Sequence, residues 1–266
     1  RDFCVYLFEH FKGRVTQYIT LNEPWVVAFA GHYTGEMAPG LRDFSAALQA
    51  AHVQLLGHGL ALQAFRQGGY PGEIGITLNL SPKEPLTGQK EDAEAALRHD
   101  GYANRWFLEP IFHGSYPDDL WKFYQDQGVT MPKTEQKDFA LISQPVDFLG
   151  INYYNIDYTA EEKSIWPIQF KTGFSAGNPM THYQMPVTPD GIRKILVRVY
   201  QDYHPSKIYI TENGASYQEH PDRHGNLPDE ARIDYLATHL LKVKEAIEEG
   251  GPVAGYFVWT LMDDFE

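Results

Sequence analysis

The sequence predicts an α/β fold, a partial (β/α)₈ TIM barrel in which about five of the eight βα units are present. Short, almost unbroken apolar runs alternate with helical patterns, as expected of parallel strands that are covered by helices. Polar residues follow these runs where each strand ends, and the first run lacks the glycine-rich turn of a doubly wound sheet. We therefore expect one barrel domain over residues 1–266, incomplete at both ends.

The first third of the chain predicts a helix, a strand and a second helix. Residues 2–12 carry apolar side chains at helical spacing, and the first strand covers Val15–Leu21. Residues 25–42, rich in glycine, are expected to form a loop. Asp43 is a good N-cap for a long helix over Phe44–Arg66.

The middle of the chain predicts two more strands with helical segments between them. The strands cover Ile74–Leu80 and Val146–Tyr154, and the helical segments cover residues 91–98 and 102–112. Residues 155–187 contain scattered glycine and proline and are expected to be a long irregular stretch.

The last third predicts two helices, each followed by a strand. The helices cover Asp190–Tyr203 and the residues from 230 to Glu249, the second with Asp229 as its cap. The strands cover Ile208–Thr211 and Val253–Leu261.

Composition limits the classes of partner. The 266 residues have a formal net charge of −13, which argues against nucleic acid and anionic membranes, because phosphate groups require a basic surface. No apolar run is long enough for a spanning helix. Cys4 is the single cysteine, which excludes an intrachain disulfide and favours the cytoplasm without fixing the compartment. The oligomeric state is left open.

Two glutamates, Glu23 and Glu212, directly follow predicted strands. Carboxyl ends of barrel strands share one face, so we expect the two side chains to face each other. Glycoside hydrolysis needs such a pair: one acid protonates the leaving oxygen and one carboxylate attacks or assists at the anomeric carbon. Asn22 is suited to bind a sugar hydroxyl, and Tyr154 to hydrogen-bond a carboxylate. Candidate stacking surfaces for sugar rings are Trp106, Tyr153, Trp166 and Trp259.

Motifs of one known family are spread over the whole chain. In order they are Thr20–Pro24 (Thr-Leu-Asn-Glu-Pro), Arg105–Ile111, Asp147–Tyr154, Ile210–Gly214 (Ile-Thr-Glu-Asn-Gly) and Gly255–Trp259. In this order they resemble the glycoside hydrolases of family 1, the β-glucosidase family. Asn-Glu-Pro alone also occurs in related barrel glycosidases. The resemblance therefore depends on finding all five motifs in this order.

The resemblance implies a retaining β-glycosidase on a (β/α)₈ barrel, with Glu23 as general acid/base and Glu212 as nucleophile. Members that cleave 6-phosphorylated sugars lack a glutamate at the position of Glu266, which favours an unphosphorylated substrate. The substrate-binding residues that the resemblance implies are Asn22 at the sugar 2-hydroxyl, Tyr154 beside the nucleophile, Asn79 and Asn152 along the site, Trp259 on the glycone ring, and Glu266 at its hydroxyls.

The sequence also departs from the family pattern. The family's first three strands and its C-terminal tail are missing, so we expect a fragment that is incomplete at both ends and has little activity alone. Met185 stands where many members carry a tryptophan on the aglycone side, and Asp264 stands where asparagine is usual.

We therefore expect hydrolysis of a terminal β-D-glucosyl unit, from a β-glucoside or a cello-oligosaccharide, by double displacement. No cofactor and no metal are expected: His52 with His58, and His220 with His224, have no third ligand nearby. One alternative is a preference for β-galactosides, β-fucosides or β-xylosides. Another is an inert, truncated barrel that only binds sugar.

Overall fold

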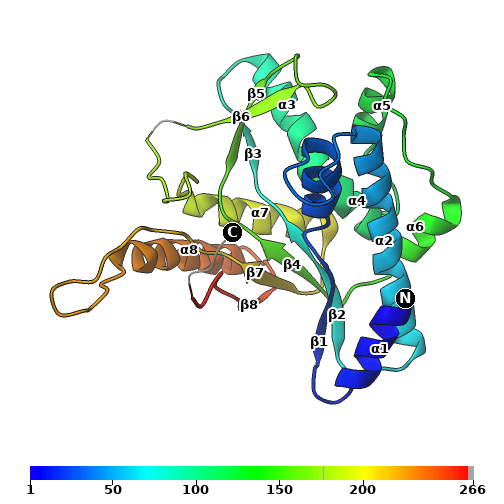
Figure 1. The fold of residues 1–266 in the computed structure, drawn as a ribbon, viewed down its shortest axis with the longest axis horizontal. Coiled ribbons are helices and arrows are strands. Elements are labelled where there is room, and N and C mark those ends of the chain that lie inside the picture. The colour runs from blue at the N-terminus through cyan, green and yellow to red at the C-terminus, as the bar shows by residue number, and fades with distance from the viewer. Residues whose placement is uncertain (176, 263–266) are drawn as a thin grey trace.

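The computed structural model describes residues 1–175 and 177–262, and its centre is a five-stranded parallel sheet (Figure 1). Its strands lie in the order in which they occur in the chain, without the reversal that marks a doubly wound sheet. This order is that of one arc of a (β/α)₈ barrel and confirms the predicted fold class. The strands are β1 (Gln17–Asn22), β2 (Glu73–Asn79), β4 (Phe148–Asn152), β7 (Ile208–Glu212) and β8 (Val253–Tyr256).

Helices connect consecutive strands of this sheet, as right-handed crossovers between parallel strands require. The predicted helices are found as α1 (Asp2–Phe11), α2 (Phe44–Gln67), α3 (Lys90–Asp100), α4 (Trp106–Phe112), α7 (Pro189–Tyr203) and α8 (Glu230–Glu248). Asp43 caps α2 as predicted, since its side chain accepts from the Ala46 N–H at 3.0 Å. The cap predicted for α8 is wrong, because the Asp229 carboxylate accepts instead from Arg232 at 2.7 Å.

The core lies between the sheet and these helices. Ile151 and Ile210 on the strands and Leu196 on α7 are completely buried. Two short helices that the sequence analysis did not assign, α5 (Asp118–Asp126) and α6 (Gln136–Ile142), close the outer side of this core (Figure 1). The inner strands β2 and β4 are buried on both faces, and their sequences are continuous apolar runs that are easy to recognise, whereas the edge strands β1 and β8 are partly exposed.

A second, three-stranded sheet corrects one prediction. Residues 155–187 were expected to be irregular, but they contain β5 (Asp157–Glu161) and β6 (Phe170–Gly173), and β5 pairs with β3 (Lys83–Pro85). The strands are only three to five residues long and mostly polar, so they carry no clear periodic signal.

Two further boundaries differ from the prediction. Val26–Thr34, expected within a loop, forms the π-helical segment η1, and Gly101–Arg105 forms a second one, η2, between α3 and α4. β8 ends at Tyr256 rather than at Leu261, so Trp259 lies in the loop that follows the strand. Wide helical turns are often found next to functional sites, and η1 directly follows Glu23.

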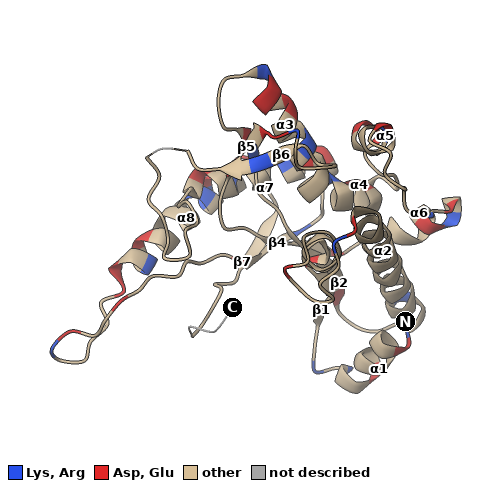
Figure 2. Ribbon diagram, turned by 45° about the horizontal axis from the view of Figure 1, so that its top comes forward, with Lys and Arg blue, Asp and Glu red and all other residues tan. Residues whose placement is uncertain are grey.

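The charged side chains lie mainly on the outer helices, where Figure 2 shows acidic residues on α3, α5 and α8. The strands β1 and β8 form the two edges of the central sheet. In the part of the chain that the structure describes, no helix is both long enough and apolar enough to cross a membrane.

Candidate active site

Polar side chains form a row at the carboxyl edge of the central sheet. Asn79 on β2 pairs in register with Asn152 on β4, and Asn152 pairs in register with Glu212 on β7. Neighbouring parallel strands end at the same edge, so one polar residue per strand is enough to build a continuous polar surface. The length of each apolar run in the sequence therefore decides which polar residue reaches this edge.

Glu23 reaches the same edge from β1 through an unusual backbone turn. Its N–H still donates to the Thr77 carbonyl of β2 at 3.0 Å, but its φ angle is +47°, in the left-handed region. That conformation costs a residue with a side chain roughly 1–2 kcal/mol, and strain of this kind is concentrated at functional sites. Its carboxylate Oε1 accepts from the Asn152 amide at 2.7 Å, so the turn aims Glu23 across the sheet edge.

Asn152 connects the two glutamates. Its buried amide donates to Glu23 and also to the Asn22 side-chain oxygen at 3.1 Å, while its own oxygen accepts from the Thr211 hydroxyl at 2.6 Å. The Asn22 amide in turn lies 3.5 Å from Glu212 Oε1. The carboxylates of Glu23 and Glu212 are therefore joined through two asparagines, although they are far apart in the chain.

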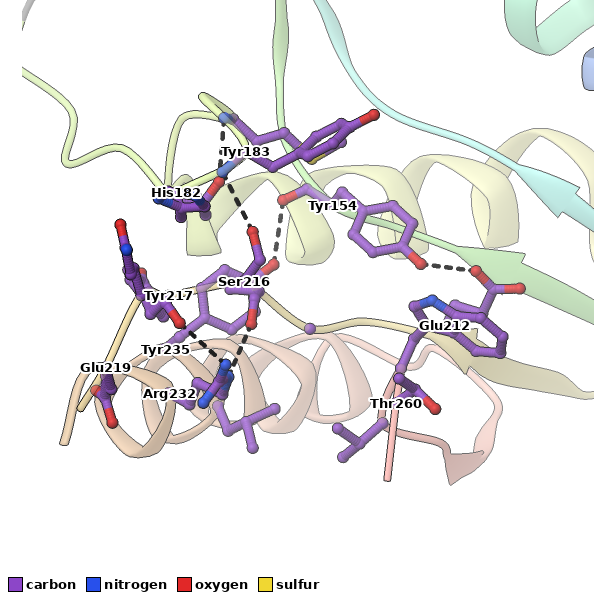
Figure 3. Close-up of a pocket in the computed structure, with 18 of the residues that line it drawn as sticks. Tyr154, His182, Tyr183, Glu212, Ser216, Tyr217, Glu219, Arg232, Tyr235 and Thr260 are labelled. Atoms are coloured by element: carbon purple, nitrogen blue, oxygen red, sulfur yellow. Dashed lines mark hydrogen bonds between the residues drawn. The ribbon is translucent and has the colours of Figure 1, made fainter. Parts of the chain in front are cut away.

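The Glu212 carboxylate is held from the opposite side by Tyr154, whose hydroxyl donates to Oε2 at 2.6 Å (Figure 3). The Tyr154 backbone carbonyl accepts from the Tyr235 hydroxyl at 3.2 Å. The short bond to Oε2 and the long approach of Asn22 to Oε1 make the two carboxylate oxygens unequal. Oε1 is the oxygen that is held less tightly.

The loop after β8 packs against the residues that follow Glu212. The Trp259 N–H donates to the Asn213 carbonyl at 3.1 Å. A Cβ atom on Gly214 would lie 1.9 Å from the Trp259 carbonyl oxygen, so only glycine fits there. The fully buried Asn213 side chain donates to the Tyr153 carbonyl and accepts from the Tyr256 hydroxyl. In the sequence Asn213 stands out only as part of the Ile210–Gly214 motif, which does not reveal this bracing role.

Both glutamates open into one cavity of about 830 Å³. Tyr154 and Trp259 also line it, with Trp259 39% exposed. The other walls come from segments that no strand-end pattern marks, and among their residues only Met185 and Gly214 were singled out from the sequence. These segments are the 181–185 turn, the 214–219 loop and the first turns of α8, including Arg232 and Tyr235.

Most, but not all, of the predicted site residues come together. Asn22, Asn152 and Tyr154 contact the glutamates directly, whereas Asn79 lies beside Asn152 in the sheet and is not part of the cavity wall. Glu266 and Asp264 lie outside the described residues.

Two of the four predicted stacking surfaces are wrong. Trp106 is completely buried and packs against Tyr116 and Trp121. Tyr153 is also completely buried and donates to the Thr188 carbonyl at 2.6 Å. Both rings fill the core, where large aromatic side chains contribute much of the buried area. Trp166 is half exposed, but it is not among the residues that line the cavity.

The histidines that a metal site would use are separated. His52 contacts Tyr116 and Asp138, and His58 contacts Thr20. Burial lowers the pKa of His58 to about 3, so its ring is neutral. Within residues 1–175 and 177–262, no group of three or more histidine, cysteine or acidic side chains is arranged to hold a metal ion.

Known proteins resemble this chain over its whole length. The model of the glycosyl hydrolase family 1 matches residues 1–266. Beta-glucosidase A of Thermotoga maritima is 38% identical over 265 residues, which cover 98% of this chain and 57% of that protein. The 1,4-beta-D-glucan glucohydrolase of Thermotoga neapolitana is also 38% identical over 265 residues, with 60% of its length covered.

A solved structure extends the likeness to three dimensions. The family 1 β-glucosidase from Thermotoga maritima in complex with isofagomine lactam superimposes with a TM-score of 0.92 at 37% identity. All of this chain and 59% of that chain are covered. The chain thus spans about 60% of the length of the relatives that it matches.

Proposed function

The chain belongs to glycosyl hydrolase family 1, and from this premise we propose that the protein is a retaining β-glycosidase that removes terminal, unphosphorylated β-D-glucosyl units. The observation that carries the proposal is the pair of strand-end glutamates, Glu23 and Glu212, joined through Asn152 and Asn22 at one cavity. A pair of carboxyl groups facing one sugar is the chemical requirement of glycoside hydrolysis.

In the first step Glu212 attacks the anomeric carbon while Glu23 protonates the glycosidic oxygen. The bond between the anomeric carbon and that oxygen breaks, the alcohol leaves, and a glucosyl ester of Glu212 forms. Because Tyr154 holds Oε2 of Glu212, Oε1 is the attacking oxygen. Because Asn152 donates to Oε1 of Glu23, the acid proton is carried on Oε2.

In the second step Glu23, now ionised, removes a proton from water. The water oxygen bonds to the anomeric carbon, the ester breaks, and β-D-glucose leaves with the configuration retained. Both glutamates return to their starting protonation states. Retention requires the carboxyl groups to be about 5–5.5 Å apart.

The substrate follows from the relatives and from the charge of the cavity. Both proteins named above are β-glucan or β-glucoside hydrolases by name. The carboxylates of Glu23, Glu212 and Glu219 line the cavity, with Arg232 as its only Lys or Arg among the described lining residues. Such a wall favours a neutral sugar over a phosphorylated one.

Release of phenol from an aryl β-glucoside, measured on the complete natural polypeptide, tests the proposal. We expect turnover in the wild type and at least a thousandfold loss in Glu212→Gln, which keeps the side-chain size but removes the nucleophile. The product anomer, followed by NMR, should be β at early times.

The alternatives give different results in the same assay. Faster cleavage of the aryl β-galactoside or β-fucoside would change the specificity but keep the mechanism. Saturable sugar binding without turnover would favour an inert sugar-binding barrel. An α-anomeric first product would contradict the double displacement.

A further inference from the structure

The turn that carries Glu23 is fixed by hydrogen bonds on both sides of that residue. The Glu23 N–H donates to the Thr77 carbonyl at 3.0 Å, and the Val26 N–H donates to the Glu23 carbonyl at 2.9 Å. With its φ angle of +47°, Glu23 has a left-handed backbone, which persists only where the surrounding contacts fix it. Each contact with this turn therefore affects the direction in which the Glu23 carboxyl group points.

A side chain of α2, Gln54, also contacts this turn. Its amide Nε2 donates to the Pro24 carbonyl at 3.2 Å and to the Ala50 carbonyl of its own helix at 3.3 Å. Because Ala50 lies one helical turn earlier, the second bond fixes the amide against α2. Pro24 directly follows Glu23 and is buried, and a buried carbonyl needs a hydrogen-bond donor. Gln54 therefore ties the backbone just after Glu23 to the helix.

The helix α2 gives this bond a rigid base. Its residues Ala51 and Leu55 are completely buried, and η1, which begins at Val26, packs against the helix (Figure 1). On the other side of the turn, the Glu23 carboxylate accepts from the Asn152 amide at 2.7 Å. The turn is thus held between β4, which contacts the carboxylate, and α2, which contacts the backbone.

We propose that Gln54 is a positioning residue for Glu23: its bond to the Pro24 carbonyl keeps the Glu23 carboxyl group where it can protonate the glycosidic oxygen. This inference rests on the proposed function, because that function makes Glu23 the general acid. Gln54 is not among the described residues that line the cavity, so its effect on the reaction passes through the backbone of residues 23–24.

A displaced general acid affects substrates unequally. Phenolate is a basic leaving group whose oxygen needs a proton as it departs, whereas 2,4-dinitrophenolate is weakly basic and leaves without one. The value of kcat/KM includes only the steps up to departure of the leaving group. Attack by Glu212 therefore contributes to kcat/KM for both glucosides, and protonation by Glu23 contributes for the phenyl glucoside. A well-placed general acid contributes about a hundred- to ten-thousandfold, so partial displacement should cost about fivefold or more.

The test compares kcat/KM for phenyl and 2,4-dinitrophenyl β-glucosides in the complete natural polypeptide. Gln54→Met keeps the length of the side chain but removes the donor. Gln54→Asn is shorter by one methylene, so its amide no longer reaches Pro24. Each variant should lower the phenyl-to-dinitrophenyl ratio of kcat/KM by about fivefold or more relative to the wild type. Thermal melting shows whether each variant is folded, and if one is not, the other decides.

Gln63→Met is the matched control. Gln63 is also a partly buried glutamine of α2, and it lies nine residues further along the helix. This variant should retain the wild-type ratio. A role of Gln54 in helix packing alone would lower stability, or lower kcat/KM for both glucosides equally. A folded Gln54 variant with the wild-type ratio therefore overturns the proposal.

Failure of the proposed function is seen separately, as the absence of cleavage of the dinitrophenyl glucoside by the wild type. In that case hydrogen exchange of the Val26 amide, followed by NMR, decides about Gln54, because this amide donates to the Glu23 carbonyl. Exchange that is at least about threefold faster in Gln54→Met than in Gln63→Met supports the hold on the turn. Equal exchange in the two variants refutes it.

Discussion

The amide of Asn152 is oriented by a single hydroxyl group. Thr211 donates to its oxygen at 2.6 Å, which leaves the amide nitrogen to donate to Glu23 and Asn22. If the amide rotated by half a turn, its oxygen would face the Glu23 carboxylate, and two acceptors would repel each other. Thr211 therefore controls, through Asn152, whether a donor or an acceptor faces the Glu23 carboxylate.

Thr211→Val should lower kcat/KM for an aryl β-glucoside by about tenfold, because Val keeps the shape but removes the donor. Thr77→Val on β2 is the control. Thr77 is also completely buried, and its hydroxyl has no hydrogen-bond partner among the described residues. That change should leave activity within about twofold and stability unchanged or higher. Equal activity in both variants would contradict the orienting role.

Tyr154→Phe should lower kcat for the same substrate by about ten- to a hundredfold with a smaller change in KM. The tyrosine hydroxyl donates to one oxygen of Glu212 and so fixes the orientation of the carboxylate. This orientation affects the attack on the anomeric carbon more than it affects substrate binding. Tyr235→Phe removes a hydroxyl that, among the described residues, hydrogen-bonds with the Tyr154 carbonyl and the Asn213 amide but not with Glu212, and its effect should be smaller. A Tyr154→Phe enzyme within twofold of the wild type in kcat would disprove this account.

At the scale of elements, the success of the sequence analysis depended on burial. The strands β2 and β4 are buried on both faces and β7 is buried on one face, so their apolar runs were recognised, and their polar ends led to Glu212, Asn152 and Tyr154. Residues whose roles depend on the packing of distant loops gave no such signal. The wall segments at 181–185 and 214–219 belong to this class.

The same reasoning explains the errors. Trp106 and Tyr153 were predicted to stack on sugars because an aromatic ring can serve binding or packing, and only the three-dimensional contacts distinguish the two. The sheet formed by β3, β5 and β6 was missed because its strands are short and polar. The ion pair that holds β3 to β5 joins residues far apart in the chain, Lys83 and Asp157.

This ion pair predicts how stability depends on pH. Burial raises the pKa of Asp157, but the Lys83 ammonium and the Ser81 hydroxyl lower it more strongly, to about 2. A carboxyl group whose pKa is lower in the folded state stabilises the fold above its ordinary pKa of 3.8. This contribution is lost as the pH falls towards 2. For a carboxylate that is 27% exposed, the contribution at pH 7 is about 1–2 kcal/mol.

Urea unfolding of the natural protein at pH 7 and pH 2.5 measures the contribution of Asp157 to the free energy of unfolding. Asp157→Asn should lower the free energy of unfolding by about 1–2 kcal/mol at pH 7 and by much less at pH 2.5. Asp126→Asn, which removes an exposed partner of Lys122 on α5, should cost at most about 0.5 kcal/mol at pH 7. A loss for Asp157→Asn that is equal at both pH values would contradict the assignment.

At the scale of the whole molecule, the central sheet has two unpaired edges in the described structure, β1 and β8. Apolar side chains are exposed near both edges and on α8. Ile19 on β1 is 47% exposed, Phe257 after β8 is 54% exposed, and Leu241 on α8 is 60% exposed. Unpaired strand edges and apolar surface of this kind drive association.

Residues 1–266 expressed alone should therefore associate, and their aryl glucosidase activity should be at least a hundredfold below that of the complete natural polypeptide. The relatives are about two-thirds longer than the part that this chain matches, and a closed (β/α)₈ barrel needs three strands more than the five of the central sheet described here. Size-exclusion chromatography and the aryl glucoside assay measure both effects. Ile233→Lys with Leu241→Lys, which places charges on the exposed face of α8, should increase the soluble fraction without restoring turnover. A monomer that melts cooperatively with full activity would show that the five-stranded arc is sufficient by itself.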